Sequence, residues 1–181
     1  MSPWFERCRP GVRTPQGAPV VHYVSAETSI GAARQQIWDF IKPPENSVLL
    51  DPRVVRGFPA PGHEGVGEVR VFISVHDGVE HVSALEDVHE IPGELAITRS
   101  FGAMDPAARG RDFLKVTDDG GTIPEHGLHF TLPGDSDQFQ YYERHRGYCQ
   151  QYVERVKSLM ERIQANKPEP SSDSGITPSE T

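Results

Sequence analysis

Eight histidines are the residues of this chain best suited to bind a metal ion or to move a proton. They are scattered along the chain, at His22, His63, His76, His81, His89, His126, His129 and His145. No His-Glu-x-x-His motif occurs, and on a strand the three-residue spacing of His126 and His129 points them to opposite faces. The two cysteines, Cys8 and Cys149, stand far apart. These spacings favour neither a metal site nor any other cofactor.

Carboxyl and phenol groups are the other candidates for acid–base chemistry. Removal of a proton from carbon needs a base inside a dry pocket, where burial raises the pKa of a carboxyl group. The carboxylates fall on the polar face and end of a predicted strand, and the remaining groups lie near the start of a predicted helix. Solvated or packing roles are therefore favoured for these residues, which are Glu86, Asp87, Glu90, Glu94, Tyr141, Tyr142 and Arg146.

Gly110 is the glycine whose position is least explained by chain geometry. Most of the 17 glycines lie in predicted turns or tails, whereas Gly110 stands between Arg109 and Arg111 at the start of a predicted strand. Glycine weakens a strand and often marks a bend, a bulge or a close approach of another molecule. Alternation sends Arg109 and Arg111 to one face, where they form either a ligand contact or a solvated pair. Gly102 and Gly127 are the next candidates.

The first third of the chain predicts a strand and two helices that would hold these residues in place. The strand covers Val20–Ile30, and Ser29 is a candidate cap for a helix that ends at Ile41. Lys42-Pro43-Pro44 stops this helix, because proline disfavours helix in the residue before it. A short second helix is predicted over Glu45–Leu50.

Alternating apolar residues and turn signals predict a run of antiparallel strands in the middle of the chain. Asp77-Gly78, Pro92-Gly93 and Asp118-Asp119-Gly120-Gly121 are the turn signals, because these residues tolerate the backbone angles of tight turns. The predicted strands are Glu68–His76, Val79–Ile91, Glu94–Phe101, Arg109–Thr117 and Thr122–Leu132.

A long amphipathic helix closes the predicted domain. Its apolar stripe recurs every three or four residues and comprises Tyr142, His145, Cys149, Tyr152, Val156, Leu159 and Ile163, widened by Val153 and Met160. A long helix laid across a curved antiparallel sheet predicts an α+β fold with a deep apolar pocket between the two.

Composition predicts one globular domain between two disordered tails. The chain has 181 residues, and residues 1–19 and 166–181 are too rich in Pro, Gly, Ser and charge to bury a core. The domain is predicted over residues 20–165. The net charge of −8 disfavours direct nucleic-acid binding. With no long apolar run and no secretory signal, we expect no membrane partner, a cytoplasmic location and a monomer.

The order of these segments resembles the SRPBCC superfamily, which includes the START, Bet v 1 and polyketide cyclase/dehydrase proteins. The matching pieces are Ser29–Ile41 with Ile37-Trp38, Gly65–Arg70, Phe113–Ile123, Pro133 and the closing helix. The resemblance implies a helix-grip fold, in which about seven antiparallel strands wrap around the long C-terminal helix, with two short helices near the start. It does not imply one activity, because functions differ widely on one fold.

Within this superfamily the whole chain is similar to the self-sacrifice resistance proteins of enediyne biosynthesis, the group that acts on calicheamicin-type antibiotics. Proteins of this group bind the activated enediyne, whose diradical takes a hydrogen atom from a glycine backbone, and the chain is cut. The resemblance implies a stoichiometric protein that is not an enzyme, with Gly110 as the sacrificial glycine.

A hydrophobic small molecule is thus the expected partner, and its expected contacts are Trp38, Phe101, Gly102, Met104, Arg109, Arg111, Phe113 and Tyr142. Core packing is the competing interpretation for the aromatic residues in this set. Two other functions stay open: a polyketide cyclase/aromatase, and a lipid or polyketide carrier without chemistry.

Overall fold

The computed structural model describes residues 20–101, 108–132 and 138–166. The predicted tails lie outside these ranges, apart from residue 166, and so do Gly102 and Met104. The strands are β1 (Val21–Glu27), β2 (Val54–Pro59), β3 (Val69–His76), β4 (Val79–Ile91), β5 (Leu95–Phe101), β6 (Arg109–Val116) and β7 (Thr122–Thr131). The helices are α1 (Arg34–Ile41), the 3₁₀ helix η2 (Pro44–Asn46), α2 (Ser47–Leu50) and α3 (Gln138–Ala165).

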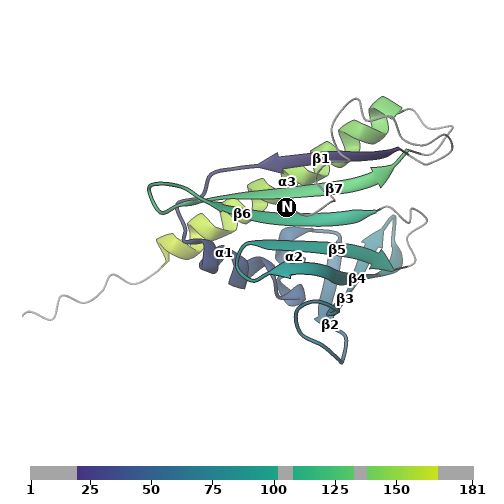
Figure 1. Cartoon of the computed structure of the whole chain (residues 1–181). Coiled ribbons are helices and arrows are strands. Elements are labelled where there is room, and N and C mark those ends of the chain that lie inside the picture. Colours follow the sequence, from purple (N-terminus) through teal and green to yellow (C-terminus); the bar gives the residue numbers. More distant parts are fainter. Residues whose placement is uncertain (1–19, 102–107, 133–137, 167–181) are drawn as a thin grey trace, which may run out of the picture.

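One antiparallel sheet of seven strands, in the order β1-β7-β6-β5-β4-β3-β2, forms the framework of the protein. The long helix α3 runs along β1 and β7, and the short helices lie near the other half of the sheet (Figure 1). This arrangement confirms the predicted α+β helix-grip fold. In the described part of the chain, no helix has the length and apolar character needed to cross a bilayer.

The two faces of the sheet differ in what covers them. We call the face toward α3 the inner face, since His126 of β7 points there and its ring contacts Tyr152 of α3. Alternation and the strand register place Gly110, Asp112 and Leu128 on this same face. The opposite, outer face carries Arg109, Arg111, Phe113, Glu125, Gly127 and His129.

Two apolar clusters fix α3 against the inner face. Near its C-terminal half, Val156 and Met160 pack with Ile37 and Trp38 of α1 and with Leu114 of β6. Near its start, a second cluster joins Val24, Ala26, Phe130, Cys149 and Val153. The predicted apolar stripe is therefore the buried face of α3, except at its end, where Ile163 is 44% exposed.

Local signals in the sequence explain most of the strand boundaries. Asp77 and Gly78 both have positive φ, at 51° and 77°, as a two-residue hairpin turn between β3 and β4 requires. Gly120 has a φ of 81° in the turn between β6 and β7. Both predicted hairpins are thus confirmed.

The structure adds one strand that was not predicted and corrects one local prediction. Strand β2 did not stand out in the sequence because Gly57 and Pro59 weaken its strand pattern, and Pro59 is tolerated because β2 is an edge strand. Ser29 does not cap the first helix. The chain instead stays extended through Ile30, whose N–H donates to the Thr122 carbonyl at 2.9 Å, and α1 begins only at Arg34.

A buried ion network ties α1 to the sheet. Asp87 of β4 is fully buried and accepts from Lys42 Nζ at 2.7 Å and from Arg70 Nη2 at 2.6 Å. Lys42 also pairs with Glu90, and lies 3.9 Å from Glu68. Because every charge in this network has an opposite partner, we assign it a structural role, the attachment of the C-terminal end of α1 to β3 and β4.

On the outer face, Tyr23 of β1 covers the backbone of β7 at Gly127. A Cβ at Gly127 would lie 2.2 Å from the Tyr23 hydroxyl, so only glycine fits beneath this ring. The hydroxyl donates to Glu125 Oε1 at 2.5 Å, and Arg111 Nη1 donates to the same oxygen at 2.6 Å. Burial, and then the hydrogen bond to Glu125, raise the pKa of Tyr23 to about 12.

We predict that Asp87→Asn lowers the free energy of unfolding by about 3 kcal/mol, because it leaves Arg70 without a buried counter-charge. The neighbouring variant Glu86→Gln is the control, since it breaks only the exposed pair with Arg99, worth less than about 1 kcal/mol. Chemical denaturation of both variants measures the difference. Equal losses in the two variants would contradict the structural role of the network.

We also predict a tyrosine-dependent loss of stability at high pH. The pKa of Tyr23 is about 12 in the folded protein against 10.0 for an exposed tyrosine, so folding disfavours the ionised phenol. The stability linked to Tyr23 is complete below pH 10 and falls as the pH rises toward 12. Between pH 9 and 11, the free energy of unfolding measured by denaturation should decline less steeply for Tyr23→Phe than for the parent protein. Identical slopes for the two proteins would refute a contribution from Tyr23.

Candidate functional site

Gly110 lies on the inner face of β6, between β5 and β7. It pairs with Thr98 of β5 on one side and with Leu128 of β7 on the other. A Cβ at this position would meet the Thr98 Oγ1 at 2.6 Å. Because glycine has no Cβ, the Cα–H bond that takes its place points toward this hydroxyl on the inner face.

Two residues further along β6, Asp112 forms a pair with His126 of β7. Asp112 Oδ1 lies 2.7 Å from His126 Nδ1, and the two residues are direct partners in the register. His126 is 8% exposed, and its Nε2 is buried without a hydrogen-bond partner. The spacing of His126 and His129 predicted that they lie on opposite faces, which is confirmed, but it gave no sign of the pair with Asp112.

Two tyrosines of α3 cover this pair. The Tyr152 ring lies 4.2 Å from the His126 ring, and the Tyr148 ring lies 5.8 Å from it. Burial raises the pKa of Tyr148 to about 12, and burial together with the charge of Asp112 raises the pKa of Tyr152 well above its usual value. Both phenols are therefore neutral hydrogen-bond donors at physiological pH.

The surface segment between α2 and β2 reaches the same helix. The Arg53 guanidinium lies over the Tyr148 ring, 5.5 Å from its centre. Arg53 is itself held by Asp51, with contacts of 2.9 Å from Nε and 2.6 Å from Nη2. Although burial alone would raise the pKa of Asp51, the hydrogen bonds and charge of Arg53 lower it.

The inner face is only partly covered around Gly110. Residues that lie on the inner face and are nevertheless only half-buried are Leu85, Ser100, Gly110, Asp112 and Leu128. Apolar atoms, hydroxyls and one carboxylate thus meet on this part of the sheet. In the described ranges, no three histidine, cysteine or acidic side chains converge in a way that could hold a metal ion.

Four predicted ligand contacts lie on the outer face instead. Arg109, Arg111 and Phe113 alternate with the inner-face residues of β6, so the two arginines share a face, as expected, on the side away from α3. The Arg111 guanidinium lies 4.8 Å from the centre of the Phe113 ring. Phe101 is 48% exposed, and Arg99 lies over its ring. These residues could contact only a ligand bound to the outer face.

The other two described contacts lie at the two ends of the helix–sheet interface. Trp38 is 6% exposed, belongs to the core around α1, and has Lys42 Nζ 5.7 Å from its ring centre. Tyr142 is half-buried near the start of α3, and its hydroxyl donates to the Tyr23 carbonyl at 3.2 Å. Both therefore have packing partners, and neither shares a contact with Gly110.

All four carboxylates that the sequence suggested as acid–base candidates form ion pairs. Asp87 and Glu90 belong to the buried ion network, Glu86 pairs with Arg99, and Glu94 pairs with Arg34 at 3.2 Å. Among the other candidates, Tyr141 stacks on His145 at 4.4 Å.

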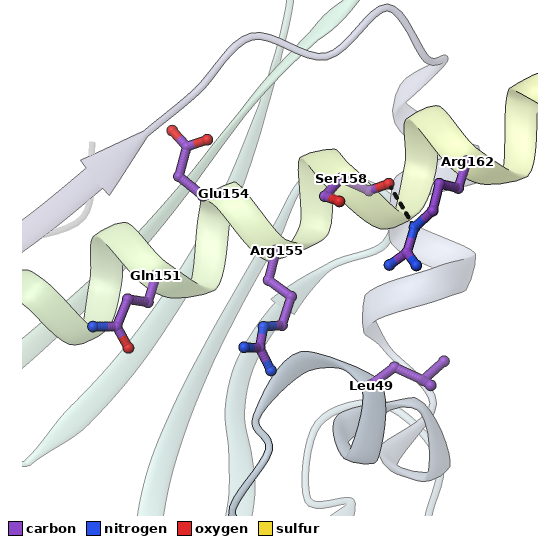
Figure 2. Close-up of a pocket in the computed structure, with 6 residues that line it drawn as sticks. All are labelled: Leu49, Gln151, Glu154, Arg155, Ser158 and Arg162. Carbon is purple, nitrogen blue, oxygen red and sulfur yellow. Dashed lines mark hydrogen bonds between the residues drawn. The ribbon is translucent and has the colours of Figure 1, made fainter.

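An open groove of about 520 Å³ lies elsewhere, between α2 and α3. Figure 2 shows that side chains of α3 and one leucine of α2 form its walls. The lining residues are Leu49, Gln151, Glu154, Arg155, Ser158 and Arg162. The groove is open, lies between two helices and has only one apolar residue among its lining, so it is not the deep apolar pocket predicted between helix and sheet.

The overall architecture resembles several solved structures. No protein-family model and no curated protein sequence matches the chain. The di-domain aromatase/cyclase StfQ of steffimycin biosynthesis superimposes with a TM-score of 0.67 at 13% identity, covering 80% of this chain and 52% of StfQ. The Zhui aromatase/cyclase of Streptomyces has a TM-score of 0.62 at 13% identity, covering 80% and 96%. A START superfamily protein of Mycobacterium smegmatis has a TM-score of 0.65 at 10% identity, covering 78% and 98%.

These structures correct one expectation. The chain was expected not to be an enzyme. That expectation is wrong, because two of the three structures with this fold are aromatase/cyclases. At 10–13% identity the likeness concerns architecture and not activity. The chain has the helix-grip fold that START and aromatase/cyclase proteins share.

Proposed function

We propose that this protein binds a hydrophobic natural product of the enediyne class on the inner face and that Gly110 donates a hydrogen atom to the activated ligand. The proposed site lies between Thr98, Gly110 and Leu128 of the sheet and Tyr148 and Tyr152 of α3. Apolar side chains with a few hydroxyl groups suit a polycyclic ligand that carries scattered oxygen atoms.

A comparison of the glycines within strands carries this proposal. At Gly57 a Cβ would lie 2.0 Å from the Pro44 carbonyl oxygen, and at Gly127 it would enter the Tyr23 ring. Both glycines are thus covered by other parts of the chain. At Gly110 the nearest atom is a single hydroxyl oxygen, that of Thr98, and the residue is half-buried on the inner face. Among these three, Gly110 alone is approached by the end of a single side chain and not by backbone or a ring, so we infer that a ligand reaches its Cα–H bond when the Thr98 hydroxyl turns away.

The chemistry follows from the position of this bond. A carbon radical of the ligand takes the hydrogen atom, so that one ligand C–H bond forms and one Cα–H bond of Gly110 breaks. The resulting Cα radical is stabilised by the amide groups on either side. Dioxygen adds to this radical, and the peroxyl radical takes a hydrogen atom from the activating thiol to give a hydroperoxide. Thiol reduces the hydroperoxide to an α-hydroxyglycine, with release of water and a disulfide. Its N–Cα bond then breaks, which leaves an amide on one fragment and a glyoxylyl group on the other. The duplex DNA that such a ligand attacks is no partner of this protein, in keeping with the net charge of −8.

A second candidate function is the cyclisation of a polyketide, which is favoured by the two aromatase/cyclases that share the fold. It requires a proton acceptor on the inner face, and His126 lies there with an unpartnered Nε2. A ligand bound at Gly110 would lie close to this imidazole, since Asp112 and Gly110 are two residues apart on one face of β6.

We predict that a thiol-activated enediyne cuts the full-length protein at Gly110, about once per drug molecule. Protein labelled with [2,2-²H₂]glycine should transfer deuterium to the aromatised ligand, and this labelling leaves the fold unchanged. Intact mass spectrometry of the protein and of the ligand product measures both events. An uncut chain together with an unlabelled product would refute the proposal.

Matched variants test the residue assignment. Gly110→Ala is best made in a Thr98→Ala background, where removal of Oγ1 leaves the new methyl group 3.9 Å from the nearest remaining side-chain carbon. Cleavage should persist in Thr98→Ala and disappear in the double variant. Gly31→Ala is the control, because no atom lies within 4 Å of a Cβ at Gly31. A cut at another glycine would support the proposed function but would reject Gly110 as the hydrogen donor.

A further inference from the structure

The groove between α2 and α3 lies apart from the inner face and has no part in hydrogen donation by Gly110. Its volume of about 520 Å³ lies within the range of small-molecule sites, about 300–1,000 Å³. Leu49 of α2 forms one wall and is 48% exposed. The other lining residues stand on one face of α3, at the helical spacing Gln151, Glu154, Arg155, Ser158 and Arg162.

Neither arginine of this groove has an acidic partner. The positions three and four residues away from Arg155 and Arg162 along α3 hold no aspartate or glutamate, so the helix supplies no ion pair to either. Arg162 Nε donates to the Ser158 carbonyl at 3.3 Å, which is a neutral acceptor. Arg155 is half-buried, and in the described part of the chain it forms no hydrogen bond and no ion pair.

Other arginines of the protein do pair with carboxylates. Six of them form such ion pairs, namely Arg34, Arg53, Arg70, Arg99, Arg111 and Arg146. The net charge of −8 means that acidic groups outnumber basic ones. A shortage of acidic groups therefore does not explain why one groove holds two arginines without carboxylate partners.

The carboxylates beside the groove are bound by other residues. Glu154 accepts from Gln150 Nε2 at 3.0 Å, and Figure 2 shows its carboxylate pointing away from Arg155 and α2. Asp51 accepts from Arg53 through both of its oxygens. Burial alone would raise the pKa of Asp51, whereas the hydrogen bonds and charge of Arg53, and after them the charge of Arg155, lower it. The charge of Arg155 thus reaches Asp51 without forming an ion pair.

The two guanidinium groups can reach one ligand. Seven residues along a helix span about 10 Å, a distance that two long arginine side chains can bridge. In Figure 2 both guanidinium groups lie on the side of α3 that faces α2. Each guanidinium can hold a carboxylate through two parallel N–H donors, and such charge-assisted bonds are stronger than neutral ones.

We propose that the groove binds an organic anion, whose carboxylate lies between Arg155 and Arg162 and whose apolar body lies against Leu49. The Gln151 amide and the Ser158 hydroxyl can bond further oxygen atoms of the ligand. The ligand class is a carboxylic acid with an alkyl or aryl chain. This inference goes beyond the proposed function and does not depend on it, because the inner face contributes no residue to the groove.

Octanoate is the probe, and octanamide is the matched neutral ligand, since both carry the same alkyl chain. In the full-length protein, we expect octanoate to shift the amide NMR signals of Leu49, Ser158 and Arg162. Octanamide should bind about tenfold more weakly, because it cannot form charge-assisted bonds. Equal binding of the two ligands would overturn the proposal, and so would shifts confined to the inner-face amides of Gly110 and Leu128.

Arg155→Gln and Arg162→Gln test the two cations. Each variant keeps a long polar side chain, and we expect each to weaken octanoate binding about tenfold while octanamide binding stays the same. Arg146→Gln removes the same charge from α3 outside the groove and is the control. Unchanged octanoate binding in both groove variants, or an equal loss in Arg146→Gln, would reject the assignment of these arginines.

Acetate and inorganic phosphate test the apolar part of the ligand. Both are anions without an alkyl chain, so we expect them to bind more weakly than octanoate. Leu49→Ser should weaken the binding of octanoate and leave that of acetate unchanged. If acetate or phosphate binds as tightly as octanoate, the groove recognises charge alone and the proposed ligand class is wrong.

Discussion

The pairing of β6 with β7 is the constraint on which the rest of the functional argument depends. In this register Gly110 faces Leu128 and Asp112 faces His126, all on the side of α3. A slip of one residue would turn every side chain of β6 to the other face and would put Arg109 and Arg111 beneath the helix. The chemistry of the inner face is therefore a direct consequence of strand register.

Several features hold this register in place. The turn after β6 is closed by a hydrogen bond from the Thr117 N–H to the Gly121 carbonyl at 3.0 Å. Leu114, 1% exposed, anchors the inner side of β6 in the core around α1. On the outer side, Arg111 is joined to Glu125 of β7. Burial alone would raise the pKa of Glu125. The hydrogen bond from the Tyr23 hydroxyl and the charges of Arg111 and Lys115 lower this pKa instead. The carboxylate thus keeps its charge and its link between the strands.

Much of the fold could be predicted because its signals are local. Alternation in β3, the Asp77-Gly78 turn and the stripe along α3 each depend on residues near one another in sequence. Strand β2 could not be recognised in this way, since its Gly57 fits beneath Pro44 and its Pro59 is tolerated only at a sheet edge. The predicted cap at Ser29 was wrong for a similar reason. The pairing of Ile30 with Thr122, which is distant in sequence, decides the conformation of the chain before α1.

The site was harder to predict, because its residues are joined across the hairpin and not along the chain. Asp112 and His126 lie seven residues before and seven residues after Asp119, in the turn between the strands, so counting outward from the predicted turn would have paired them. No such count could reveal that Nε2 is left without a partner, since this depends on how Tyr148 and Tyr152 of α3 cover the ring. The same limit applies to Phe101, whose side of the sheet is set by pairing with β4.

Glycine at position 110 has two physical consequences that belong together. The absence of a Cβ lets Thr98 Oγ1 approach β6 closely, which alone is a sufficient structural reason for glycine. The same absence leaves a Cα–H bond that points toward Thr98 Oγ1, on the same face of the sheet as the pair of Asp112 and His126. Two residues along a strand span roughly 6.6 Å, about the width of a fused-ring ligand. One ligand on the inner face would therefore touch both groups, so that its own chemistry, radical or enolisable, decides which of them reacts.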